Sequence, residues 1–168
     1  MKFTQVFIVA LVVVCAGCTT AAPDTRAADE AAIKALEARF TAAFKARDIT
    51  AIMANYVPDQ SLLVFDVAPP RQIIGADGYK KDWEGYLTAF PGPWDLTLSD
   101  LEITVGGDVA YGHNVQRTAF TDQAGKKTEV TVRVTDGYKK INGQWLISHE
   151  HVSVPVDLAT MKPDLDSK

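Results

Sequence analysis

The segment from Val130 to Asp136 places a carboxylate in apolar surroundings. Val130, Val132 and Val134 alternate with polar residues, which predicts a strand with one apolar and one polar face. Asp136 continues the apolar side of this alternation. Because a lone carboxylate is costly to ionise there, we expect it to be paired, hydrogen-bonded or protonated. Two interpretations stay open: an acid in a functional pocket, or a structural carboxylate satisfied by nearby groups.

Asp66 is a second candidate for acid–base chemistry. It ends a predicted strand that begins at Ser61, and it precedes the strand-breaking pair Pro69-Pro70. A carboxylate at a strand end can act as a general base in a pocket. It can equally form an Asx-type turn with the following backbone. The sequence leaves both interpretations open.

His149 and His151 occupy alternate positions of a predicted strand, so both side chains share one face. Which face they share depends on the turn at Asn142-Gly143. A two-residue turn would place Asp136 opposite His149 and both in the pocket. A three-residue loop with a glycine bulge would place Asp136 opposite Ser148 and turn the histidines to the other face. Apolar matching favours the second register, in which the histidines belong to a subunit interface.

A metal site at the histidines is the weaker alternative. His149 and His151, together with His113, would offer imidazoles that zinc or iron accepts. The sequence does not identify a further ligand or the groups that would orient these side chains. We therefore predict no metal site and no cofactor.

Several large side chains combine a role in the core with a possible place on a cavity wall. Aromatic residues at helical or strand spacing are first of all packing residues, and a cavity contact is an additional role. The predicted ligand contacts are Phe40, Tyr56, Trp83, Trp94, His149 and Glu150.

The N-terminal residues predict export. A basic start at Met1-Lys2 and an apolar run from Val6 to Ala16 are typical of a secretory signal, and the run is too short to span a bilayer. Ala16-Gly17 before Cys18 resembles a bacterial lipoprotein signal, although Cys15 stands where that signal usually has Leu, Val or Ile. We predict a periplasm-facing membrane lipoprotein lipidated at Cys18. The alternative is a soluble periplasmic or secreted protein cleaved after residues 20–22.

The remaining chain divides simply. We expect a signal peptide at 1–18, a tether at 19–28, one domain at 29–160 and a tail at 161–168. The predicted domain contains no cysteine, which excludes disulfides and thiolate catalysis within it. The net charge is −4 and the basic residues are scattered, so nothing predicts nucleic-acid binding. Apart from the lipid anchor, no membrane contact is expected.

Helices precede strands along the domain. Ile33, Leu36, Phe40 and Phe44 recur at helical spacing, which leaves Glu37 among the residues expected to face solvent. The predicted helices cover 29–47, a short segment capped by Asp48, and 77–90. Long strands are predicted at 94–105, 108–121, 127–140 and 144–156.

The predicted architecture is α+β. A shift in the apolar phase of the strand at 94–105 predicts a β-bulge near Ser99-Asp100, and bulges bend sheets. Helices over one face of a bent, mostly antiparallel sheet enclose a cone-shaped interior. Such an interior suits a small apolar ligand.

The sequence also resembles a known family. Arg39 to Asp48, Tyr56 to Asp59 and Phe65-Asp66 are similar to the opening of the ketosteroid isomerase and SnoaL-like superfamily. Val134 to Gly143 and Trp145 to Ser153 fit the same superfamily, and the last segment also resembles the calcium/calmodulin-dependent kinase association domain. The resemblance implies a cone-shaped α+β barrel with a mixed, mostly antiparallel sheet. It is less informative about function, because this fold supports isomerases, cyclases, hydratases and non-catalytic modules.

The resemblance to ketosteroid isomerase implies roles for single residues. Asp66 corresponds to the general base and Asp136 to the neutral carboxylic acid of the oxyanion hole. Phe40 stands at the position of the oxyanion-hole tyrosine and has no hydroxyl. Because the loss of one such donor costs on the order of a hundredfold in rate, this departure argues against the isomerase reaction.

The sequence leaves three functions open. The first is an exported SnoaL-like protein that binds a small apolar or carbonyl- or carboxylate-containing molecule without catalysis. The second is an isomerase- or cyclase-like enzyme that uses Asp66 as base and Asp136 as neutral acid. The third is a dimeric interaction module with a vestigial pocket. In each case we expect a homodimer.

Overall fold

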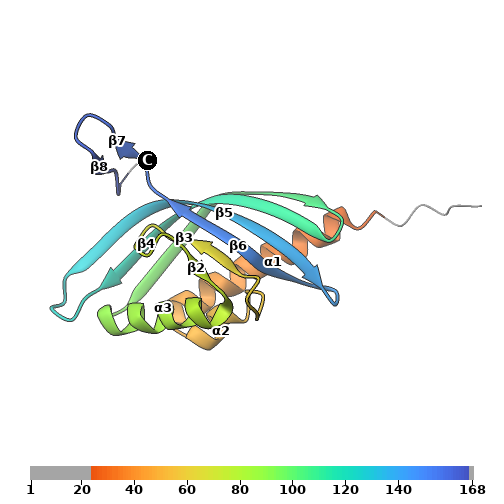
Figure 1. Ribbon diagram of the computed structural model, residues 1–168, viewed down its shortest axis with the longest axis horizontal. Helices are drawn as coiled ribbons and strands as arrows, with labels where there is room; N and C mark the ends of the chain where they lie inside the picture. Colours follow the sequence, from red (N-terminus) through yellow and green to blue (C-terminus); the bar gives the residue numbers. More distant parts are fainter. Residues whose placement is uncertain (1–23, 167–168) are drawn as a thin grey trace, which may run out of the picture.

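The computed structural model describes residues 24–166, in which the helices lie under a strongly curved sheet (Figure 1). The predicted signal peptide, Cys18 and the first half of the predicted tether lie outside these residues. The helices are α1 (Arg26–Ala46), α2 (Ile49–Met53) and α3 (Ala76–Ala89). Helix α1 begins three residues before the predicted start at Asp29, so residues 26–28 are helical rather than part of a tether. No helix among the described residues is long and apolar enough to cross a membrane.

Local sequence signals end and begin the first two helices. Arg47 follows α1 in the left-handed conformation, with φ 58°, and its N–H bonds back to the last turn. Asp48 then caps α2, because its carboxylate accepts the N–H of Ala51 at 2.9 Å. The connection between α1 and α2 is therefore short, and it folds α2 back against α1.

The strands form one curved sheet and one small hairpin. The bounds are β1 (Leu63–Phe65), β2 (Ile73–Ile74), β3 (Trp94–Gly106), β4 (Val109–Thr121), β5 (Lys127–Ile141), β6 (Gln144–Ser153), β7 (Val156–Asp157) and β8 (Lys162–Pro163). The main sheet has the order β2-β1-β6-β5-β4-β3. Among the named strands of the described residues, β1 and β6 alone pair in parallel, so the predicted mixed, mostly antiparallel sheet is confirmed.

The predicted bulge in β3 is present. The pairing of β3 with β4 shifts between Ser99 and Glu102, and Asp100 has φ 55°. The one extra residue bends β3 where its apolar phase changes. This bend contributes to the curvature that lets the sheet close over the helices.

The pairing of β5 with β6 differs from both predicted registers. Asn142 and Gly143 form a two-residue turn with φ 51° and 82°. Further along the pairing, Ser148 is an extra residue in β6, which forms a β-bulge. Its hydroxyl donates a hydrogen bond to the carbonyl of Gly137 at 3.1 Å. Asp136 therefore lies opposite Glu150. The two predicted partners, His149 and Ser148, were both wrong.

The bulge at Ser148 also decides which face the histidines occupy. His151 lies opposite Thr135 and His149 opposite Gly137, so both histidines point to the outer face of the sheet. This placement matches the outer-face alternative, although it arises from a different register.

The core lies between α1, α3 and the inner face of the sheet. Ile33, Leu36 and Phe40 of α1 are buried as predicted. Glu37 is a correction: it is buried rather than solvent-facing, with 3% of its surface exposed. It stands four residues after Ile33 and three before Phe40, which places it on the apolar stripe of the helix.

The chain after β6 forms a hairpin that projects from the body (Figure 1). Strand β6 ends at Ser153, three residues before the predicted end, because the chain leaves the sheet at Val154-Pro155. Beyond the β7–β8 hairpin the chain returns to the sheet, where the N–H of Thr131 bonds to the carbonyl of Leu165 at 2.7 Å. Position 160, the predicted end of the domain, lies inside this hairpin.

Candidate functional site

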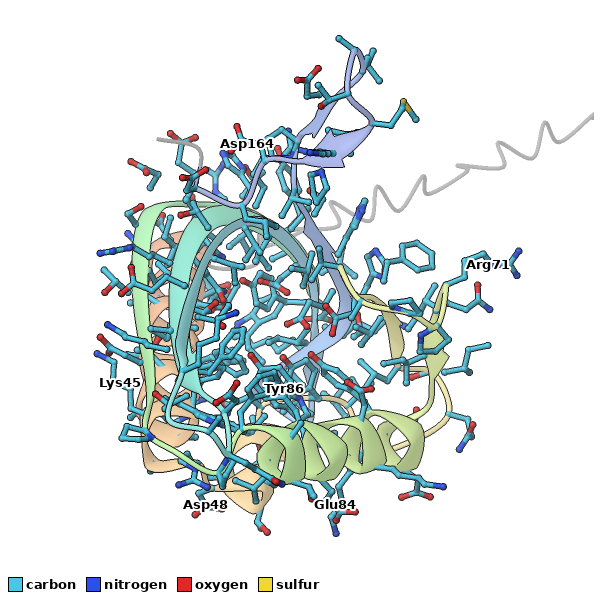
Figure 2. The ribbon with its side chains drawn as sticks, turned by 90° about the vertical axis from the view of Figure 1, so that its left-hand side faces the viewer. Lys45, Asp48, Arg71, Glu84, Tyr86 and Asp164 are labelled. Atoms are coloured by element: carbon cyan, nitrogen blue, oxygen red, sulfur yellow. The ribbon has the colours of Figure 1, made fainter. Side chains whose placement is uncertain are left out.

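A cavity of about 950 Å³ lies between α3, the β1–β2 segment and the inner face of the sheet. Tyr86 points from α3 into this space, whereas Glu84 on the same helix points away from it (Figure 2). Much of the wall is aromatic. The aromatic lining residues are Phe40, Phe44, Tyr79, Trp83, Tyr86, Phe90 and Phe120.

Trp83 is the centre of the aromatic wall. Its ring lies 6.4 Å from that of Phe40 and 5.9 Å from that of Phe44, and both contacts are edge-on. The Tyr86 ring lies 5.9 Å from the Trp83 ring, also edge-on. Such interlocked rings bury a large apolar area and hold one another in place. The wall is therefore built before any ligand enters.

Glu150 is the main polar group of the cavity. The hydroxyl of Tyr56 donates to its Oε2 at 2.7 Å, and the hydroxyl of Tyr79 donates to its Oε1 at 2.5 Å. Glu150 is buried, with 5% of its surface exposed, and it lines the cavity. Tyr56 follows α2 and Tyr79 belongs to α3, so three separate segments meet at this carboxyl group.

Burial and hydrogen bonding act in opposite directions on Glu150. The pKa of its carboxyl is raised to about 7, because burial raises it more than the hydrogen bonds from the two tyrosine hydroxyls lower it. The pKa values of Tyr56 and Tyr79 are raised by burial and by the adjacent Glu150 charge, so both phenols stay protonated. Glu150 can thus exchange a proton near neutral pH, as an acid or base requires.

Asp136 lies behind Glu150 rather than on the cavity wall. It is fully buried, with 1% of its surface exposed, as its place in the apolar alternation predicted. Its Oδ1 has no hydrogen-bond partner among the described residues. Burial, with the charges of Glu150 and Glu37, raises its pKa well above the usual value. A carboxyl in this setting is stable in its protonated form.

Glu37 and Tyr138 complete the buried polar cluster. The Tyr138 hydroxyl donates to Oε1 of Glu37 at 2.7 Å, which joins α1 to β5. Burial raises the pKa of Glu37. No sequence motif pointed to a role in the site for either residue, or for Tyr79. For Glu37 a signal was present, since its position continues the apolar stripe of α1.

Asp66 combines a place on the cavity wall with hydrogen bonds to the backbone that follows it. It lines the cavity just after β1, and its Oδ1 accepts the N–H of Val67 at 2.5 Å. Burial raises its pKa, and the backbone N–H groups of Val67 and Ala68 lower it. Asp136, its proposed catalytic partner, is not among the residues that line the cavity, so the two carboxyl groups do not share the cavity wall.

Half of the six predicted ligand contacts line the cavity, and the other half do not. Phe40, Trp83 and Glu150 line the cavity. Tyr56 does not line the cavity; it supports the wall from behind, through its hydrogen bond to Glu150 and its ring contacts with Phe40 and Tyr79. Trp94 is buried behind Trp83, with ring centroids 6.1 Å apart.

The histidines lie away from the cavity. Nδ1 of His149 is 2.9 Å from the carbonyl of Leu63, and its ring meets that of Phe65 edge-on. Nε2 of His113 lies 3.6 Å from a carboxylate oxygen of Glu102 on the outer face. Between residues 24 and 166, no group of three or more His, Cys, Asp or Glu side chains is arranged to hold a metal ion.

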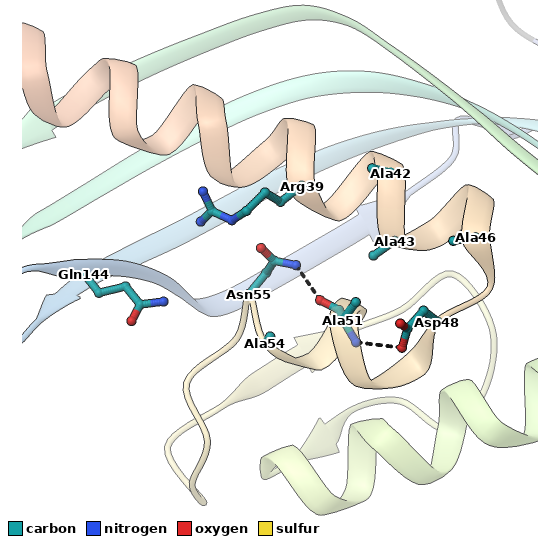
Figure 3. Close-up of a pocket in the computed structure, with 9 residues that line it drawn as sticks. All are labelled: Arg39, Ala42, Ala43, Ala46, Asp48, Ala51, Ala54, Asn55 and Gln144. Carbon is teal, nitrogen blue, oxygen red and sulfur yellow. Dashed lines mark hydrogen bonds between the residues drawn. The ribbon is translucent and has the colours of Figure 1, made fainter.

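A second hollow, of about 510 Å³, lies between α1, α2 and the start of β6 (Figure 3). Its walls are mostly alanine methyl groups. Its polar groups serve the local backbone: Asp48 caps α2, and Nδ2 of Asn55 donates to the carbonyl of Ala51 at 2.9 Å. Arg39 lines the hollow from α1. This hollow lacks the convergent polar groups of the main cavity.

The fold and cavity define a cone-shaped α+β domain with an apolar interior that ends in buried carboxyl groups. The SnoaL-like domain model matches residues 33–157, and the chain belongs to this family. No curated protein sequence matches the chain significantly.

Solved structures agree with this assignment. A nuclear-transport-factor-2-like protein of unknown function from Pseudomonas putida KT2440 is 33% identical, with a TM-score of 0.76 over 84% of this chain and 97% of that one. A Xanthomonas campestris protein named after the calcium/calmodulin-dependent protein kinase II association domain is 23% identical, with a TM-score of 0.63 over 72% and 84% of the two chains. A Novosphingobium aromaticivorans protein named after scytalone dehydratase is 21% identical, with a TM-score of 0.70 over 79% and 88%. The two more distant structures show the shared fold alone.

Proposed function

We propose that the protein binds a small, largely apolar molecule in the cone cavity, with the polar end of that molecule at Glu150. The observation that carries this proposal is the cavity itself: its volume of about 950 Å³ is within the range of small-molecule sites, and its wall is aromatic. A single buried carboxyl group fixed by Tyr56 and Tyr79 provides the orienting contact.

The positions of Phe40 and Asp136 favour binding over isomerase-type turnover. Phe40 lines the cavity without a hydroxyl, so it offers no donor to an oxyanion. Asp136 lies outside the cavity wall, so a ligand at Asp66 does not meet it there. We extend the proposal to an exported protein, in line with the predicted N-terminal signal.

A pair of matched variants tests cavity binding. Val132 lines the cavity from β5, whereas Val115 on the neighbouring strand points to the outer face of the sheet. Val132→Phe fills the cavity and Val115→Phe adds the same ring outside it. The neutral fluorescent probe N-phenyl-1-naphthylamine is titrated into each protein.

We expect the wild type and Val115→Phe to bind the probe alike, and Val132→Phe to bind it at least about tenfold more weakly. Circular dichroism checks that the variants are folded. Equal affinity of Val132→Phe and the wild type, or no binding by the wild type, would overturn the proposal.

A further inference from the structure

The ionisable interior of the domain is acidic. Among residues 24–166, the buried charged side chains are Asp29, Glu37, Asp136 and Glu150, and none is a lysine, arginine or histidine. Asp29 alone has a basic partner, the partly exposed Lys140, whose Nζ lies 2.7 Å away. The other three carboxyl groups face one another without a nearby cation, although buried charges are normally paired.

Contacts across the sheet and from α1 bring these three groups together. Glu150 lies opposite Asp136 in the β5–β6 pairing. Glu37 reaches the same region from α1 through its bond to Tyr138. The pKa of each carboxyl is raised by burial, and Asp136 is raised further by the charges of the other two. The cluster therefore creates a negative potential behind the cavity whenever any of its members ionises.

The ionisable side chains of the cavity wall are also mostly acidic. Of the described residues that line it, Asp66, Asp82 and Glu150 carry carboxyl groups, and Lys81 alone carries a basic group. Lys81 is exposed on α3, so its ammonium group can stay in water. A ligand carboxylate in this cavity would meet three acids, whereas a ligand cation would be attracted by them.

The aromatic wall is suited to the same kind of ligand. The faces of tryptophan, tyrosine and phenylalanine rings attract cations, and tryptophan does so most strongly. Trp83 lines the cavity among Phe40, Phe44 and Tyr86. The wall can therefore contact both an apolar body and the carbon atoms next to a charged nitrogen.

We propose that the ligand is an organic cation: a protonated amine on an aromatic or other apolar body, with its ammonium group hydrogen-bonded to Glu150. The inference rests on the proposed binding function and specifies the ligand class. The Glu150 oxygens each accept one tyrosine hydroxyl, and each has a further lone pair for a ligand N–H. The ammonium group then supplies the positive charge that the buried acids lack.

This arrangement makes binding depend on pH. The titratable groups that face Glu150 are Tyr56 after α2, Tyr79 on α3, Asp136 on β5, Glu37 on α1 and Asp66 after β1. All of these are acids or phenols, so none provides the positive charge in place of the ligand. Because the pKa of Glu150 is about 7, an ammonium ligand that binds at pH 6 must displace a proton from it. Amine affinity should therefore rise from pH 6 to pH 8.

A charge series on one skeleton tests the inference. 2-Naphthylmethylamine, 2-naphthylmethanol and 2-naphthoate compete against N-phenyl-1-naphthylamine for the full-length protein at pH 6 and pH 8. We expect the amine to bind at least about tenfold more tightly than the alcohol at pH 8, and the carboxylate most weakly. The preference for the amine should shrink at pH 6. Calorimetry of amine binding at pH 6 in two buffers should show proton release.

Two variants locate the effect. Glu150→Gln should bind amine and alcohol with similar affinity, whereas Glu84→Gln, which removes the same charge on the far side of α3, should keep the wild-type preference (Figure 2). The charge series on the wild type tests the inference even when Glu150→Gln does not fold.

The outcomes separate this inference from the proposed function. If the wild type fails to bind the fluorescent probe, cavity binding itself is wrong. If the probe binds but the alcohol or the carboxylate displaces it as well as the amine does at pH 8, only the organic-cation inference is overturned. A preference that persists unchanged in Glu150→Gln would also overturn it.

Discussion

Asp136 and Glu150 lie directly opposite each other on β5 and β6, with both side chains buried on the inner face of the sheet. Like charges at opposed positions repel, and neither group lies near a buried cation. The two carboxyls therefore titrate as a pair, and ionisation of one raises the pKa of the other. The extra residue Ser148 creates this pairing, since it brings Glu150 into the position that His149 would otherwise occupy.

Asp136→Asn is expected to be neutral or stabilising at pH 8. Burial and the facing carboxylates raise the folded-state pKa of Asp136, so the folded state binds the proton more tightly than the unfolded chain does. Its contribution to stability is complete below the unfolded pKa of about 3.8 and is lost as pH rises. The variant should lose part of the decline in stability between pH 5 and pH 8, measured by denaturant unfolding at both values.

Asp29→Asn provides the control of opposite sign. Hydrogen bonds from Lys140, Thr25 and Trp145 lower the pKa of Asp29 to about 2. Its contribution to stability is present above about 3.8 and is lost as pH falls toward 2. This variant should be destabilised at pH 7. Destabilisation of Asp136→Asn that grows toward pH 8 would show instead that Asp136 is an ionised structural carboxylate.

Tyr79→Phe is expected to make the domain more sensitive to alkaline pH. The Tyr79 hydroxyl donates to Glu150 at 2.5 Å and lowers its pKa. Without it the pKa of Glu150 rises above about 7, so the stability lost between the unfolded pKa of about 4.5 and pH 8 increases. Glu150→Gln should remove the loss, which for the wild-type shift from 4.5 to about 7 is about 3 kcal/mol.

Tyr86→Phe is the matched control for this measurement. Tyr86 lies on the same helix and lines the same cavity, and its hydroxyl makes no hydrogen bond to Glu150. Unfolding by denaturant from pH 5 to pH 8 should therefore give the wild-type profile. Identical profiles for Tyr79→Phe and Tyr86→Phe would contradict the proposed role of the Tyr79 hydroxyl.

Local sequence patterns predicted most of the fold. The apolar period of α1 and the capping residue Asp48 each act within a few residues, so they are readable without tertiary contacts. The position of the turn at Asn142-Gly143 was readable in the same way, but its length was not, because apolar matching favoured the three-residue loop over the two-residue turn that forms. The bulge at Ser99 was predicted because it changes the apolar phase of its own strand.

The site was less predictable because it depends on pairing between distant segments. Ser148 interrupts the β5–β6 register with no glycine or proline in β6 itself to mark it; the one glycine at the irregularity is Gly137 on the facing strand. Glu150 becomes the central carboxyl group only when Tyr56 and Tyr79, 94 and 71 residues away in sequence, reach it. Its importance therefore follows from the packing of three segments rather than from a motif.

We expect the domain to form a homodimer through the outer face of the sheet. His113, Thr135 and His151 form a row across β4, β5 and β6 on that face, and two-fold interfaces on such a face bring equivalent rows together. Thr135→Arg adds a charge at the centre of the row, next to its own copy in the partner. Sedimentation velocity at micromolar concentration should show a dimer for the wild type and a monomer for this variant.

Thr50→Arg controls for the added charge. Thr50 is exposed on α2, remote from the outer face of the sheet, so this variant should remain dimeric. A monomeric wild type would remove the interface role of His149 and His151. A dimeric Thr135→Arg would place the interface elsewhere.

The last prediction concerns the N-terminal signal. Cys18 is expected to become the acylated first residue of the mature protein, and Thr19 after it is not the Asp that commonly retains such proteins in the inner membrane. Cys18→Ser should therefore release soluble protein into the periplasm, because a lipid anchor is what holds the chain at the membrane.

Cys15→Ser is the matched control, since it replaces the neighbouring cysteine inside the predicted signal peptide and leaves the acylation site intact. Fractionation should find this variant with the membrane, like the wild type. Mass spectrometry of the wild-type N-terminus should detect a lipid-modified Cys18. An unmodified wild-type chain that begins near Ala22 or Pro23 would instead establish the alternative of plain secretion.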